Sequence, residues 1–310
     1  MEERIYGPAM DPGTQLERDM EWVKNEILLE KETNKKIARI TFNRPEKLNA
    51  FMRSHYIYLT KLLRELNWDD DVKVIIFKGA GSCFGTGHDV AELGTMHGHD
   101  TPGKGRRPSQ RQRLLGDMGL KELIFEPLHK CLKTTIAQVH SYCYGFHFQL
   151  AMASDLVVCT PDARFTHPGF RYIGPTFDLA LWLQIMGVRR LKEMVLTGKA
   201  FDAEEALQYG LVNKVVPYDK LEEETNKLAE AAAAMPFDGI VMGKTFLQGI
   251  LDAAGVAVGE YIGYMGHAMQ TAIHYEPGEF NLLKERRDKG IKGATMSRDT
   301  LWDPELDLRK

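Results

Sequence analysis

The stretch VKVIIFKGAGSCFGTGHDV, residues 72–90, decides the fold. Its first half is a short run of β-branched and aromatic residues, and its second half is a turn rich in glycine. A short apolar run that ends at glycine is typical of a strand buried on both faces of a parallel sheet. We therefore predict an α/β fold in which this strand leads directly into a glycine-rich turn.

The same pattern returns about sixty residues later. The run TTIAQV at 134–139 leads into the turn SYCYGF at 141–146, a helical stretch follows, and DLVVCT at 155–160 reads as the next strand. In an α/β fold, strand ends of this kind meet at one crevice, which is where ligands bind. Each turn can expose a backbone amide, and two such amides can stabilise one negatively charged ligand oxygen. A helix that starts after the second turn adds its positive dipole end.

Further elements lie on both sides of these two units. Residues 27–45 alternate like a hairpin, residues 50–68 carry apolar side chains at helical spacing, and Asp202 and Glu205 are spaced like a variant capping box. We predict an N-terminal extension at 1–30, a core at 31–220 with a mobile, arginine-rich loop at 94–116, a helical region at 221–290 and a polar tail at 291–310.

Composition excludes several classes of partner. The formal net charge of -3 over 310 residues provides no general attraction to nucleic acid or to an anionic membrane. The loop at 94–116 is basic but lacks interleaved aromatic residues, so RNA binding is disfavoured. No apolar stretch approaches the roughly 20 residues that cross a bilayer. We predict neither a nucleic-acid partner nor a membrane partner.

Cysteine and histidine spacing predicts the compartment and argues against a metal site. The 4 cysteines lack metal-type spacing, and the N-terminal residues lack the apolar run of a signal peptide. We therefore expect a reducing, cytoplasmic location. His97 and His99 have no third ligand at a suitable spacing, so we predict no metal.

Several motifs together resemble the crotonase superfamily, also called the enoyl-CoA hydratase/isomerase superfamily. They stand in the family's order and spacing between about residues 36 and 290: RITFNRPEKLNAF, VIIFKGAGSCFGTGHDV, AMASDLVV and MVLTGKAFDAEEALQYGLVNKVVP. The resemblance implies a crotonase-type ββα spiral core, a C-terminal helical trimerisation region and a homotrimer or a hexamer of paired trimers. It also implies an acyl-CoA substrate and no cofactor beyond the coenzyme A of that substrate.

The resemblance also implies where substrate binds. The two amides that would stabilise the thioester oxygen carry over to His88 and Phe146. Coenzyme A would lie near the C-terminal helix around residues 282–286 and along two further segments, represented by Lys47, Leu48, Ala50, His88, Asp89 and Val90.

The chain departs from the family pattern at both catalytic glutamates of the hydratases. Gln149 and Gly169 stand at these positions, and neither residue transfers protons at neutral pH. Replacement acids or bases are His88, His147, His167 and Asp178, although Asp178 is also suited to capping a helix. Hydratase, isomerase and hydrolase chemistry remain open, and the alternative is a catalytically silent acyl-CoA-binding or structural subunit.

Overall fold

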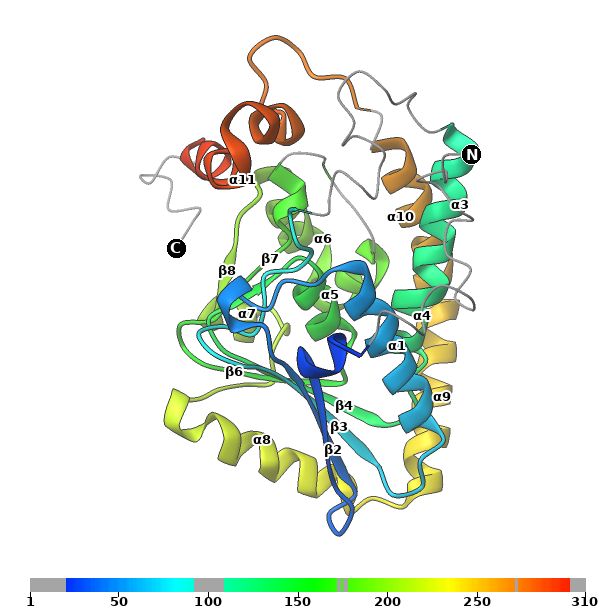
Figure 1. The fold of residues 1–310 in the computed structure, drawn as a ribbon. Helices are drawn as coiled ribbons and strands as arrows, with labels where there is room; N and C mark the ends of the chain where they lie inside the picture. Colours follow the sequence, from blue (N-terminus) through cyan, green and yellow to red (C-terminus); the bar gives the residue numbers. More distant parts are fainter. Residues whose placement is uncertain (1–20, 92–108, 172–173, 175–177, 271–272, 302–310) are drawn as a thin grey trace.

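The computed structural model describes residues 21–91, 109–171, 174, 178–270 and 273–301 (Figure 1). Its centre is a six-stranded sheet with the strand order β1-β2-β3-β4-β6-β9. The strands are β1 (Ile27–Glu32), β2 (Ile37–Phe42), β3 (Val74–Gly79), β4 (Thr134–Val139), β6 (Leu156–Cys159) and β9 (Lys214–Val215). Only β1 is antiparallel to its neighbour, and all other neighbouring strands are parallel. This sheet confirms the predicted α/β class.

A second, three-stranded sheet lies beyond the ends of β3 and β4. It has the order β5-β7-β8 and is formed by β5 (Tyr142–Tyr144), β7 (Arg164–Thr166) and β8 (Phe201–Asp202). β5 is part of the second glycine turn, so this small sheet holds that turn in place.

Both faces of the large sheet are buried, as the apolar run of β3 requires. Ile75 and Phe77 point into the main core, which also contains residues of α1 (Arg53–Asn67) and α5 (Phe146–Ala153). Val74 and Ile76 point to the opposite face and meet Ala229 of α8 (Tyr218–Ala233). Figure 1 shows α8 on one side of the sheet and α1 and α5 on the other.

The remaining helices lie around this core. They are η1 (Val23–Asn25), η2 (Pro45–Lys47), α3 (Gln110–Leu120), η3 (Lys121–Phe125), α4 (Glu126–His129), η4 (Pro168–Arg171), α6 (Leu179–Thr197), α7 (Ala203–Gln208), α9 (Phe237–Ala253), α10 (Val256–Gln270) and α11 (Leu282–Thr300). The predicted capping box is present at α7, where the Glu205 amide donates to Asp202 over 2.9 Å and the Asp202 amide donates to Glu205 over 3.2 Å.

Three predicted boundaries differ from the structure. The predicted loop at 94–116 lies outside the described residues as far as residue 108, but its end forms the start of α3, which packs on α10. The predicted extension at 1–30 includes the start of β1 and the fully buried Val23. The predicted tail from 291 begins at a break in α11 at Gly290, after which the helix continues to Thr300.

Candidate active site

The two glycine turns lie side by side. Gly85 pairs with Cys143, and the Gly85 amide donates to the Tyr142 carbonyl over 2.9 Å. A β-carbon on Gly87 would lie 2.9 Å from the Tyr144 carbonyl oxygen and 3.0 Å from the Gly145 Cα. The backbones therefore approach each other too closely for a side chain at Gly87, whose φ of +88° also favours glycine.

Backbone geometry directs the two predicted amides. The Phe51 amide donates to the Gly87 carbonyl and the Asp89 amide donates to the Phe51 carbonyl, each over 2.8 Å. In such a parallel bridge the amide of the residue in between, His88, points to the opposite side. Phe146 is the first residue of α5, where a helical amide has no acceptor within its own helix.

His147 lies beneath the first turn. Its Nδ1 accepts a hydrogen bond from the Gly87 amide over 3.1 Å, and its ring packs edge-on against Phe42 and Phe51. Burial lowers the pKa of His147 to about 3, so the ring is neutral at physiological pH. A β-carbon on Gly85 would overlap this ring. Of the predicted proton-transfer candidates, His147 is thus the one whose contacts support the shape of the turn.

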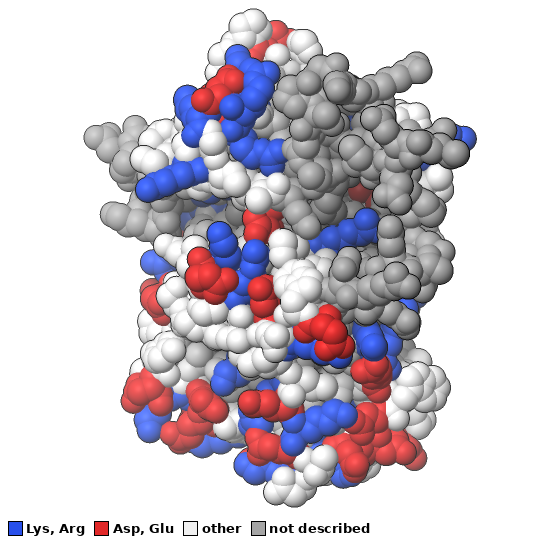
Figure 2. Space-filling model, in the orientation of Figure 1, with Lys and Arg blue, Asp and Glu red and all other residues white. Residues whose placement is uncertain are grey.

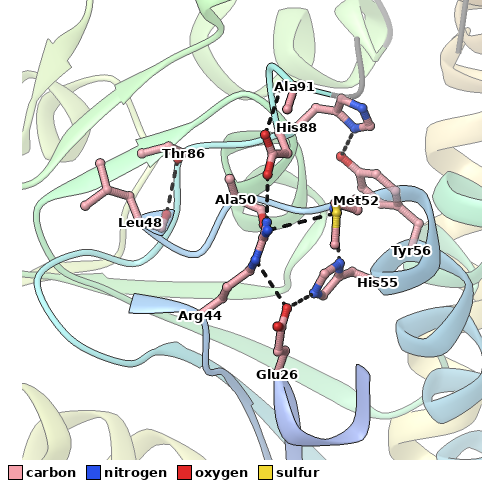
Figure 3. Close-up of polar contacts among 11 residues, drawn as sticks. Glu26, Arg44, Leu48, Ala50, Met52, His55, Tyr56, Thr86, His88 and Ala91 are labelled. Atoms are coloured by element: carbon pink, nitrogen blue, oxygen red, sulfur yellow. Dashed lines mark hydrogen bonds and ion pairs between the residues drawn. The ribbon is translucent and has the colours of Figure 1, made fainter. Parts of the chain in front are cut away.

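The His88 side chain and a polar network connect the first turn to residues 44–52 (Figure 3). The Tyr56 hydroxyl lies 3.1 Å from His88 Nδ1, and the two rings stack. Burial lowers the pKa of His88 to about 4. Arg44 donates to Asp89 and to the Ala50 carbonyl, each over 2.9 Å. Although burial raises the pKa of the Asp89 carboxyl, the Ala91 amide and Arg44 bring it below its usual value.

This network brings together the segments predicted to bind coenzyme A. Lys47 and Leu48 are exposed, and the Leu48 carbonyl accepts the Thr86 amide over 3.2 Å. Arg286 of α11 donates to the Val90 carbonyl over 2.8 Å, so the third predicted segment also reaches this edge. Figure 2 shows lysine and arginine side chains gathered over α11, whereas acidic and basic side chains mix at the opposite end of the molecule.

Asp178 is the buried carboxylate nearest the start of α6. Its side chain is 1% exposed, and neither carboxylate oxygen has a hydrogen-bond partner among the described residues. It occupies the N-cap position of α6 with a φ of +57° but makes no capping hydrogen bond. Burial raises the pKa of Asp178 to about 6. A group of this kind suits general base catalysis, since its pKa lies close to neutral pH.

Two residues that the sequence analysis missed lie next to Asp178. His129 at the end of α4 places its Nε2 3.9 Å from Asp178 Oδ1 and its Nδ1 2.9 Å from Glu260 Oε1 on α10. Although burial opposes it, the bond to Glu260 and the charge of Asp178 raise the pKa of His129. The Lys121 Nζ atom lies 3.4 Å from Glu260 Oε2 and 2.6 Å from Glu126 Oε1.

The cluster of His129, Asp178 and Glu260 also has metal-ligating residue types. Their ligand atoms lie within 4.8 Å of one another. The Lys121 ammonium and the His129 ring already pair with Glu260, however, and a cation at this position would be repelled by Lys121. The arrangement therefore suits a protonated His129 between two carboxylates better than binding of a metal.

Aromatic residues connect Asp178 to the second turn. The ring centroid of Trp182, one turn into α6, lies 4.9 Å from that of Phe148 of α5 and 6.4 Å from that of His167. Burial lowers the pKa of His167 to about 4. Among the described residues, His167 Nδ1, Trp182 Nε1 and Gln149 Nε2 are buried without hydrogen-bond partners. Buried polar atoms of this kind are uncommon, and their gathering here indicates a place where ligand groups or water bind.

Comparison with known proteins shows the family and the fold of the chain. A family model described as "Enoyl-CoA hydratase/isomerase" matches residues 32–256. The chain is 28% identical over 256 residues to the putative enoyl-CoA hydratase EchA13 of Mycobacterium tuberculosis, covering 77% of each protein. It is 30% identical over 200 residues to the peroxisomal Δ(3,5)-Δ(2,4)-dienoyl-CoA isomerase of Arabidopsis thaliana, covering 63% of this chain and 71% of the isomerase. The crystal structure of enoyl-CoA hydratase from Mycobacterium smegmatis superimposes with a TM-score of 0.74 at 27% identity, covering 89% of this chain and 93% of that one.

Proposed function

Because the chain belongs to the enoyl-CoA hydratase/isomerase family, we propose that it is an acyl-CoA isomerase that shifts a carbon–carbon double bond. The amides of His88 and Phe146 hold the thioester oxygen as the enolate forms. Asp178 removes a proton from one carbon of the acyl chain and returns it to another.

The state of Asp178 is the observation that carries this proposal. A carboxylate buried without hydrogen bonds is costly to fold, so its presence requires a compensating role. A pKa of about 6 leaves it mostly ionised at neutral pH and still able to hold a proton that it has abstracted.

The absence of carboxylates at two other positions favours isomerisation over hydration. Hydration needs one group to activate water and a means of delivering a proton to carbon, which the family's hydratases accomplish with two glutamates. On the resemblance described above, Gln149 and Gly169 stand at those positions in this chain, and neither residue can exchange protons at neutral pH. Moving a double bond needs only one base, since the proton that leaves one carbon is the proton that is added to the other.

The amide pair supplies electrostatic stabilisation where negative charge develops. Preorganised backbone donors of this kind lower an activation barrier by roughly 3 to 4 kcal/mol each in related chemistry. The Phe146 amide also stands at the positive end of the α5 dipole. His147 contributes by accepting the Gly87 hydrogen bond, which fixes the turn that carries His88.

We place coenzyme A along the edge formed by Lys47, Leu48, Ala50 and the segment from His88 to Val90, with α11 alongside. The exposed Lys47 and the basic residues of α11 are suited to the phosphates. Coenzyme A enters as part of the substrate, and a proton shift requires no separate cofactor.

A homotrimer or paired trimer, assembled through α9 and α10, completes the proposal. These helices present a large exposed apolar surface that includes Phe246, Ile250, Ile262 and Met269, each at least 62% exposed. An exposed apolar area of this extent is typical of an interface between subunits.

Among the described residues no single helix could span a bilayer, and only the α9–α10 pair, bent by 62°, meets the criteria of length and composition jointly.

The proposed compartment is the reducing cytoplasm. All 4 cysteines are free and buried, consistent with an environment that keeps thiols reduced. Burial raises the pKa of the Cys83 thiol to about 11, so it is not available as a nucleophile.

The test uses defined acyl-CoA thioesters. The purified protein is incubated with trans-3-hexenoyl-CoA, 3,5-octadienoyl-CoA and crotonyl-CoA, and products are analysed by mass spectrometry and ultraviolet absorbance. We expect the double bond of the first two esters to move without a gain of water. Addition of water to crotonyl-CoA would instead make the protein a hydratase, and binding without any change would favour the catalytically silent subunit.

A further inference from the structure

We propose that His129, oriented by Glu260, is a positioning residue that keeps the Asp178 carboxylate charged and aimed for proton abstraction. This inference rests on the proposed role of Asp178 as the base. It assigns a function to two residues that lie outside the glycine turns and were not singled out from the sequence.

The geometry places His129 between two carboxylates. Glu260 Oε1 is 2.9 Å from His129 Nδ1, which fixes the ring and directs Nε2 toward Asp178 Oδ1 at 3.9 Å. Nε2 has no hydrogen-bond partner among the described residues, and neither has either oxygen of Asp178. The 3.9 Å separation is too long for a hydrogen bond. It is short enough for a strong electrostatic interaction, because the side chains of His129 and Asp178 are only 4% and 1% exposed and water screens their charges little.

Close helix packing brings Glu260 into this position. Gly259 precedes it on α10, and a β-carbon on Gly259 would overlap the β-carbon of Ala180 in the first turn of α6. The absence of a side chain at Gly259 therefore lets α10 approach the start of α6, where Asp178 lies. The position of His129 between Glu260 of α10 and Asp178 at the start of α6 depends on that approach.

The surrounding charges favour a protonated His129. The groups that face the pair come from three surrounding elements: Lys121 on η3, Asp252 on α9, and Glu260 and Tyr264 on α10. Carboxylates outnumber the single lysine, so an imidazolium reduces the net negative charge of the cluster. This explains why the pKa of His129 is raised although the ring is buried.

The proton balance of the reaction does not change. Asp178 takes a proton from carbon, the electron pair of that bond moves into the enolate, and the same proton returns to another carbon. His129 keeps its own proton throughout and acts only through its charge. Without that charge the carboxyl of Asp178 would stay protonated to higher pH, and a protonated carboxyl cannot act as a base.

The test is the pH dependence of kcat/KM for the His129→Gln variant, with 3,5-octadienoyl-CoA as the probe. Wild type should gain activity as the pH rises through about 6. In the variant this acidic limb should move upward by about 1 to 3 pH units, the usual effect of one nearby opposite charge on a carboxyl group, with KM little changed. His274→Gln is the matched control, because that side chain is 85% exposed.

Two results would overturn the inference. One is an equal loss of activity at every pH, which is what a merely structural role of His129 predicts. The other is an acidic limb that does not move. Asp178→Asn separates this outcome from failure of the proposed function: if that variant retains full activity, Asp178 is not the base, whereas inactivity of Asp178→Asn with an unmoved limb in His129→Gln refutes the positioning role alone.

A second measurement covers the case in which His129→Gln does not fold. Wild-type protein labelled with carbon-13 at aspartate carboxyls is titrated by NMR, and the Asp178 resonance is identified by its absence in Asp178→Asn. Two coupled groups titrate in two steps, so the Asp178 signal should respond once near pH 6 and again as His129 loses its proton. A single step would contradict the proposal.

Discussion

Replacing Asp178 with asparagine should inactivate the protein while making it more stable. Folding raises the carboxyl pKa from 3.8 to about 6. A native pKa above the unfolded value means that the native state holds the proton more tightly, so stability is greatest below about pH 4 and falls as the pH rises to about 6. The difference of about 2 pKa units corresponds to ~3 kcal/mol of stability lost at pH 7, and the asparagine variant avoids this loss.

Asparagine is the suitable replacement because of the backbone. Asp178 has a φ of +57°, a left-handed conformation that asparagine also adopts readily, so the exchange removes the charge without adding strain. Loss of a general base should lower kcat by about 100- to 10,000-fold. The assays are isomerisation of 3,5-octadienoyl-CoA and calorimetric unfolding at equal protein concentration at pH 4 and pH 7.

The two pH values supply the internal control. Wild type and variant should unfold with nearly the same free energy at pH 4, where both side chains are largely uncharged, and should differ at pH 7. A variant less stable than wild type at pH 7 would refute the reasoning, since it would mean that His129 and the other partners stabilise the carboxylate by more than its burial costs.

Three further predictions concern the turns and the apolar surface. Replacing His147 with phenylalanine keeps the aromatic packing but removes the acceptor of the Gly87 amide and so loosens the turn that carries His88. The expected fall in kcat is up to about 100-fold, the lower end of the cost of losing an oxyanion donor outright, without any shift in the pH profile; an unchanged kcat would contradict its role. Gly87→Ala forces a β-carbon to 2.9 Å from a carbonyl oxygen and should destabilise the protein by ~1 to 3 kcal/mol and abolish turnover, which thermal unfolding and the same kinetic assay would check. Phe246 is 62% exposed, and Phe246→Glu places a charge on the apolar surface of α9 and α10. The mass measured by light scattering should fall toward that of a monomer, whereas an unchanged mass would exclude α9 from the interface.

Local sequence patterns were enough to predict most of the fold. The apolar run of β3 and the alternation of β1 and β2 are short-range signals, and so is the Asp202–Glu205 capping box. The sequence around the start of α3 predicts a loop, because residues 94–116 are rich in glycine, proline and arginine. Its helical structure instead comes with tertiary packing on α10, which a local pattern does not report.

The candidate site was predictable only where it is built from local segments. The two glycine turns follow two strands, so their meeting at one edge could be inferred from the order of strands. His129 and Glu260 lie on α4 and α10, far apart in the chain, and neither belongs to a motif. Their pairing is a product of helix packing. Likewise, the residue type of His147 suggested proton transfer, and only its buried contacts with Phe42 and Gly87 reveal a supporting position.

The α10 helix turns one face toward the cluster around Asp178 and the other face outward, and this orientation has a consequence for insertions. Glu260 and Tyr264 face inward on this helix, while Tyr261, Ile262 and Met265 are each more than half exposed. Adding one residue within the first turn of α10 would turn every residue that follows by about 100° around the helix axis. The Glu260 carboxylate would leave His129 and Lys121 at the same moment as the apolar stripe left the surface, so the register of α10 fixes the charge environment of Asp178 and the outer face of the molecule together.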